Sequence, residues 1–113
     1  MKDKILKAID ENRDAIISCG EYILNNPEFG YKEFKTSQRV KEEFDKLGIP
    51  YESELAITGV KGTVGKKDAS INVCIIGELD AIKCFEHPLA NKETGAAHAC
   101  GHNAQIASMI GAA

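Results

Sequence analysis

Apolar residues recur every three or four positions near the amino end of the chain, with charged residues between them. The apolar positions are Ile5, Ile9, Ile16, Cys19 and Ile23. This period predicts one amphipathic helix over residues 2–24, with Cys19 in the core. Pro27 follows at once and ends the helix, because proline has no backbone N–H and pushes the preceding residue toward an extended conformation.

A second stretch has the same period. Its core-facing positions are Phe34, Ser37, Val40, Phe44 and Leu47, and its charged positions are Lys41, Glu42, Glu43 and Lys46. The pattern predicts a helix over residues 34–47 whose charged face is solvated. Gly48 and Pro50 come directly after it and mark its end.

Beyond the second helix the period changes to that of strands. Residues 58–64 are typical of a short, glycine-punctuated strand or hairpin, followed by a turn at Lys66-Lys67-Asp68. Residues 71–76 form an almost continuous apolar run, which predicts a central strand covered on both faces, with Cys74 buried and inert. Helices around a mixed sheet with a central strand define an α/β fold.

Two acidic residues follow this apolar run in the sequence GELDAI. Ligands collect beyond the carboxyl ends of strands in open α/β sheets, so Glu78 and Asp80 are well placed to bind a metal or to orient a ligating histidine. If the strand continues, their side chains point the same way. For Glu78 a purely structural role is equally open. The long loop over residues 83–97 has no period, and we interpret its His87 and Cys84 as incidental.

Near the carboxyl end, a thiol lies between two imidazoles in HACGHN. We expect Asn103 to be the N-cap of a small-residue helix over 104–113, so that Cys100 and His102 lie in the positive field of its N-terminus. That field favours thiolate and neutral imidazole, the forms that bind zinc or a similar ion, although two or three ligands leave the shell incomplete. A Cys100 nucleophile with His102 as its base, and a merely packed turn, remain open alternatives.

Composition narrows the function classes. The 113 residues suit one small domain, and the formal charge of −3 gives no sign of a nucleic-acid or anionic-membrane partner. The amino end has neither a signal peptide nor a membrane span, so the expected location is cytoplasmic. The four cysteines contain no CxxC pair, which argues against a dithiol redox site.

Three segments together resemble one enzyme family: NPEFGYKEFKTS, GELDAI and HACGHN occur in the order found at the N-terminus of aminoacylase-like and carboxypeptidase-like metallohydrolases. The branch of N-acyl-amino-acid, auxin-conjugate and p-aminobenzoyl-glutamate hydrolases is the most similar. The resemblance implies that Cys100 and His102 are metal ligands, with His98 close to the site. Asp80 is implied to support a ligand, while Glu78 and Asn103 stand where many relatives carry Asp. Glu33 also matches a position that is common in the family, and we interpret its role as structural.

The resemblance also implies an α/β/α sandwich, a divalent ion such as Zn or Mn, and hydrolysis of an amide in a small N-acyl amino acid or peptide-like substrate. We therefore expect residues 1–113 to be the N-terminal portion of a catalytic domain. The general-base glutamate, further ligands and the lid or dimerisation domain of a homodimeric enzyme would lie downstream, and this chain alone would be inactive. Two other hypotheses are a stand-alone metal-binding or interaction module completed by a second chain, and a thiol-dependent regulatory protein.

Overall fold

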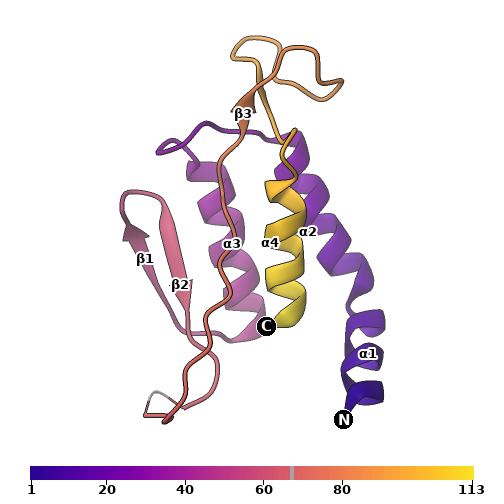
Figure 1. Ribbon diagram of the computed structural model, residues 1–113, viewed down its shortest axis with the longest axis vertical. Coiled ribbons are helices and arrows are strands. Elements are labelled where there is room, and N and C mark those ends of the chain that lie inside the picture. Colours follow the sequence, from indigo (N-terminus) through magenta and orange to yellow (C-terminus); the bar gives the residue numbers. More distant parts are fainter. Residues whose placement is uncertain (67) are drawn as a thin grey trace.

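A computed structural model describes residues 1–66 and 68–113. Its elements are α1 (Lys2–Glu11), α2 (Arg13–Asn25), α3 (Phe34–Leu47), β1 (Tyr51–Leu55), β2 (Gly59–Gly62), β3 (Ile82–Lys83), β4 (Ala96–Ala97) and α4 (His102–Ala112) (Figure 1). β1 pairs with β2 and β3 with β4, both antiparallel. This mixture of helices and strands confirms the α/β class. The turn predicted at residues 66–68 includes Lys67, which lies outside the described residues.

The predicted N-terminal helix is two helices. They meet at Asn12, where φ is −102° and ψ is 5°, and the Asn12 side-chain amide donates to the carbonyl of Ala8 at 2.8 Å. α1 extends away from the other helices (Figure 1) and buries no residue. The expected core positions of Ile5 and Ile9 are therefore wrong, because 55% and 41% of their surfaces are exposed.

The core lies between α2, α3 and α4. It consists of Cys19, Ile23, Val40, Phe44, Ile49, Ile106 and Ile110. Cys19 is fully buried, as predicted. Small residues let α4 approach α2 closely: a Cβ added at Gly20 would come within 3.1 Å of the Cβ of Ala107. Small side chains on α4 thus serve packing against another helix.

α3 has the predicted bounds and ends at Gly48, whose φ of 66° is the left-handed conformation that glycine adopts without strain. The prediction that its charged face is solvated is wrong at Glu43, which is 5% exposed. Its carboxylate lies 2.9 Å from both Arg39 Nη2 and Lys46 Nζ. These two cations compensate the cost of burying a carboxylate that points toward the core side of the helix.

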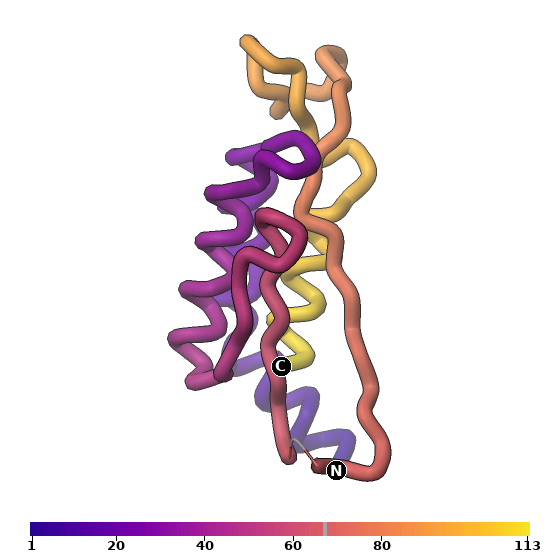
Figure 2. Tube along the Cα trace, turned by 90° about the vertical axis from the view of Figure 1, so that its left-hand side faces the viewer, coloured from indigo at the N-terminus to yellow at the C-terminus, as the bar shows by residue number. Residues whose placement is uncertain are grey.

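The prediction of a central strand over residues 71–76 is wrong. These residues are extended, but they form no β-ladder with any described residue. In the side view this segment runs along the right-hand edge of the molecule (Figure 2). Cys74, expected to be buried, is exposed, and Val73 is 86% exposed. Burial on both faces requires a covering layer on each. α4 packs closely against the residue that follows this segment, because a Cβ added at Gly77 would come within 2.8 Å of Ile106 Cδ1.

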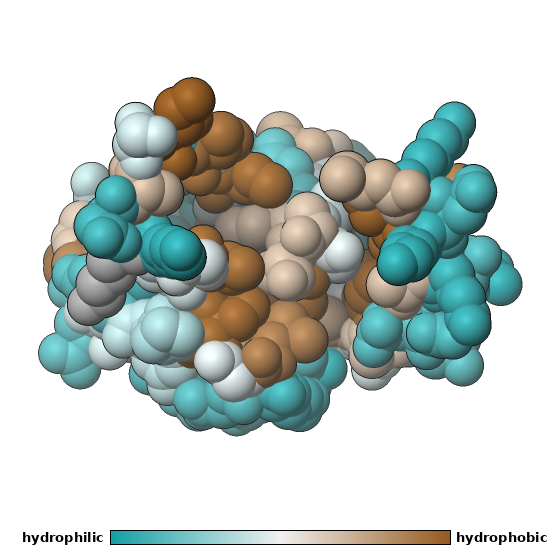
Figure 3. Space-filling view, turned by 90° about the horizontal axis from the view of Figure 1, so that it is seen from below, coloured by the Kyte–Doolittle hydropathy of each residue, from teal (hydrophilic) through white to brown (hydrophobic). Residues whose placement is uncertain are grey.

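Seen from below, hydrophobic side chains gather around a hollow at the end of the molecule where the extended segment begins (Figure 3). The exposed apolar residues of that segment are Ile71, Val73, Ile75 and Ile76. No helix in the described part of the chain is both long and apolar enough to cross a bilayer.

Candidate metal site

The loop after the extended segment is held in place by the turn that precedes α3. The Ala81 N–H donates to the carbonyl of Glu28 at 2.7 Å, and Phe29 and Ala81 form an isolated parallel bridge. The Glu28 carboxylate in turn accepts hydrogen bonds from the backbone N–H groups of Lys35 and Thr36, at 3.1 and 2.9 Å. The Glu28 carboxylate therefore caps the first turn of α3, and the Glu28 carbonyl holds Ala81, the residue after Asp80, in place.

At this point two elements distant in sequence meet. Glu78 and Asp80 come from the loop, and His102 is the first residue of α4. One potential ligand atom from each lies within 4.8 Å of the other two. The structure thus brings together three of the residues that the sequence singled out, and the side chains of Glu78 and Asp80 reach the same imidazole, as their spacing predicts.

The two ring nitrogens of His102 have different environments. Nδ1 lies 2.7 Å from the backbone carbonyl of Asp80 and 3.2 Å from its Oδ1, whereas Nε2 lies 3.1 Å from Glu78 Oε2. A carbonyl oxygen can only accept, so Nδ1 carries the proton and the lone pair of a neutral ring is on Nε2. The lone pair on Nε2 and the Glu78 carboxylate oxygen repel each other at 3.1 Å unless a proton or a cation lies between them. The geometry fits a histidine ligand whose other nitrogen is fixed by a carboxylate residue.

Sequence reasoning missed one residue that supports this cluster. Gln105, one turn into α4, accepts from the backbone N–H of Glu78 at 3.2 Å and donates from Nε2 to Glu78 Oε2 at 3.2 Å. These two bonds fix both the backbone and the carboxylate of Glu78. The available signal was the i, i+3 spacing of His102 and Gln105, which places both side chains on one face of the helix.

His98 lies inside the protein, close to this cluster. It is 5% exposed, and neither ring nitrogen has a hydrogen-bond partner among the described residues. Burial, and then the positive charge that His102 can carry, lower the pKa of His98 from its usual value, against opposing effects from the Asp80 and Glu28 carboxylates. The lowered pKa favours the neutral ring.

Cys100 is an exposed free thiol and is not a member of the cluster of Glu78, Asp80 and His102. It lies in the turn before α4, directly before Gly101, whose φ is 81°. α4 begins at His102 and makes no side-chain cap bond, so the prediction that Asn103 is the N-cap is wrong. Because Asn103 lies inside the first turn, its side chain reaches across to the carbonyl of Gly20 at 3.5 Å.

The loop over residues 83–97 is closed by the β3–β4 pair, a short element that its sequence did not predict. Within it, His87 Nδ1 accepts from the backbone N–H of Leu89 at 3.1 Å, and neither His87 nor the half-buried Cys84 belongs to the acidic cluster. Glu33 is 6% exposed and accepts from the Thr58 hydroxyl at 2.8 Å, which ties α3 to the β1–β2 hairpin.

Over most of its length the chain is similar to proteins named as hydrolases. It is 39% identical over 103 residues to the IAA-amino acid hydrolase ILR1-like 5 of Arabidopsis thaliana, covering 88% of this chain and 23% of the relative. It is 33% identical over 115 aligned residues to thermostable carboxypeptidase 2 of Saccharolobus solfataricus, with coverages of 98% and 29%. With the N-acyl-L-amino acid amidohydrolase of Geobacillus stearothermophilus the identity is 29%, with coverages of 99% and 31%.

No family model matches the sequence. The similarity to these enzymes nevertheless extends over most of the chain, which resembles a part of these longer amidohydrolases and carboxypeptidases. The chain spans 23% of the length of the Arabidopsis relative and 31% of the Geobacillus relative. The family resemblance drawn from the three sequence segments is confirmed.

Proposed function

We propose that this chain contributes part of a divalent-metal centre to an amidohydrolase that cleaves the amide bond of small N-acyl amino acids or peptide-like substrates. The observation that carries the proposal is the geometry of His102, with Nδ1 on the carbonyl of Asp80 and Nε2 turned toward Glu78. The names of the relatives supply the reaction class: they include an IAA-amino acid hydrolase and an N-acyl-L-amino acid amidohydrolase.

In this proposal His102 and Cys100 bind the ion, with Glu78 beside them. The ion is zinc or manganese: thiolate and imidazole suit zinc, and carboxylate suits manganese. Asp80 keeps Nδ1 of His102 protonated and so keeps Nε2 free to coordinate. The buried, neutral His98 excludes water from the wall of the site. When bound, the ion supplies polarisation of the substrate amide carbonyl and acidification of a water molecule.

In this proposal the catalytic glutamate and the remaining ligands belong to other parts of the enzyme. The enzyme works in the cytoplasm as a homodimer. Two or three ligands leave the coordination shell unfilled. We therefore expect the 113-residue chain alone to bind metal weakly and to show no turnover of N-acyl amino acids. Amidase activity in the purified chain that is abolished by Cys100→Ala would contradict this expectation.

The metal centre is tested by titrating the purified chain with Zn²⁺ and, for its visible spectrum, with Co²⁺. His102→Ala should weaken metal binding by about tenfold or more, a change of about 1.4 kcal/mol. The matched control is His87→Ala, which removes an imidazole from the nearby loop and should leave metal affinity unchanged. Equal affinities for wild type and His102→Ala would overturn the proposed site.

A further inference from the structure

A cavity of about 470 Å³ lies between the first two turns of α3 and the tip of the β1–β2 hairpin. Its lining residues are Phe34, Ser37, Lys41, Glu54, Ile57 and Thr58. None of these residues belongs to the cluster of Glu78, Asp80 and His102. The volume is within the range of about 300–1,000 Å³ that small-molecule sites occupy.

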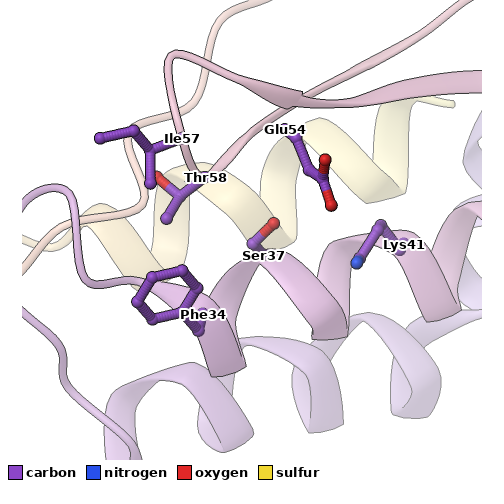
Figure 4. Close-up of a pocket in the computed structure, with 6 residues that line it drawn as sticks. All are labelled: Phe34, Ser37, Lys41, Glu54, Ile57 and Thr58. Carbon is purple, nitrogen blue, oxygen red and sulfur yellow. The ribbon is translucent and has the colours of Figure 1, made fainter.

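The lining is divided by chemistry along the cavity. Phe34 and Ile57 lie at one end, and Lys41 and Glu54 lie at the other, with their charged groups turned toward the cavity (Figure 4). Phe34 is 62% and Ile57 57% exposed, so both offer apolar surface that the rest of the described chain does not cover. One end of the cavity therefore suits an apolar group and the other suits charges of both signs.

Two buried hydroxyls also line the cavity, Thr58 beside Ile57 and Ser37 between the two ends (Figure 4). Ser37 is 7% and Thr58 6% exposed. Thr58 donates to the buried Glu33 carboxylate at 2.8 Å, which leaves its oxygen free to accept. The Ser37 hydroxyl points into the cavity (Figure 4) and has no hydrogen-bond partner among the described residues. The middle of the cavity thus offers hydrogen bonds to a polar ligand atom.

The two charges are not used elsewhere. No ion pair joins Lys41 or Glu54 to another residue in the described ranges. The hairpin holds Glu54 and Ile57 over α3 at positive φ, 60° and 84° respectively, conformations that non-glycine residues rarely adopt and that a β-branched residue adopts least readily. Backbone of this kind is concentrated at ligand sites, where the surrounding structure maintains it.

We propose that this cavity binds a free α-amino acid with a large apolar or aromatic side chain. In such a molecule the ammonium and the carboxylate leave one carbon together, so both can reach the charged end at once. The carboxylate meets Lys41 and the Ser37 hydroxyl, the ammonium meets Glu54, and the side chain lies between Phe34 and Ile57. The site is separate from the metal centre, and the proposal does not depend on that centre.

The ligand class is tested by titrating the ¹⁵N-labelled 113-residue chain, with EDTA present, with L-phenylalanine. Saturable shifts are expected at the amides of Ser37, Ile57 and Thr58. Two analogues dissect the charges: hydrocinnamate lacks the ammonium and phenethylamine lacks the carboxylate. Each should bind about tenfold more weakly than the amino acid or worse. Absence of saturable shifts, or equal binding of all three compounds, would overturn the proposal.

Matched variants test the residues. Lys41→Met and Glu54→Gln should each weaken L-phenylalanine binding by about tenfold or more, because each removes one charge of the pair. Lys35→Met changes another lysine of α3, and Glu52→Gln another glutamate of β1, and both should bind as wild type does. The same spectra report whether each variant is folded. Equal weakening by the control variants would show that net charge, and not this cavity, controls binding.

Discussion

Gln105→Leu is the sharpest test of how the metal site is built. Gln105 makes two hydrogen bonds to Glu78, one to its backbone N–H and one to its carboxylate, each 3.2 Å long. Leucine has a similar size and a high helix propensity but can make neither bond. The substitution therefore removes the support of the carboxylate while leaving α4 and the three clustered side chains in place.

The size of the effect follows from the exposure of Glu78. Residues that orient metal ligands typically change metal affinity by about 10–100-fold when they are mutated. The side chain of Glu78 is 58% exposed, so water can replace part of what Gln105 provides. We expect the lower end of the range, a loss of about tenfold in Zn²⁺ affinity, which corresponds to about 1.4 kcal/mol.

The assay is competition for Zn²⁺ against a chromophoric chelator, with urea unfolding measured in parallel. The free energy of unfolding should stay close to that of wild type, because Gln105 is exposed. Ser108→Ala is the control, since Ser108 lies one turn further along α4 and bonds only to the carbonyl of Ala104. If Gln105→Leu binds Zn²⁺ as tightly as wild type does, the supporting role is refuted. If wild type itself binds no Zn²⁺, the proposed metal centre fails instead.

Three further predictions concern the fold and the thiols. Ile106→Ala removes a fully buried side chain from the core, and should lower the free energy of unfolding by about 2–5 kcal/mol in urea titrations. Glu28→Gln weakens three hydrogen bonds at the start of α3 and should cost about 0.5–2 kcal/mol in the same assay. Burial raises the pKa of the Cys19 thiol, so less thiolate exists at a given pH. Iodoacetamide at pH 8 should therefore modify Cys74 and spare Cys19 in the native chain, as mapped by peptide mass, and equal labelling would contradict the packing of α2.

Local sequence was sufficient where the determining contacts are local. The period of three and four predicted both ends of α3, because a helix boundary depends on residues within one turn of it. Cys19 is buried as predicted, since its position on the apolar stripe coincides with the surface that α2 presents to α4. The alternation of Glu78 and Asp80 likewise placed both carboxylates on one side of the chain.

The same patterns failed where burial depends on a distant partner. Ile5 and Ile9 continue the apolar stripe, yet α1 diverges at Asn12 and no described element covers them. Glu43 looked like a surface residue, but Arg39 and Lys46 neutralise it and permit its burial. Cys74 lies in an apolar run, and a strand of this kind is buried only when other elements cover both of its faces. Cys74 is exposed, because no described element covers it in this way.

What the sequence by itself determined about this protein is the bounds of α3, the resemblance to amidohydrolases, and the chemical groups available for a metal site. Only the tertiary structure decided that Gln105 clamps Glu78, a residue 27 positions away, and that the ring of His102 lies between two carboxylates. Side-chain periodicity records which face of a helix or strand is apolar, and it arises within a few residues. Which groups finally meet depends on how separate elements pack, and that is decided by contacts between residues far apart along the chain.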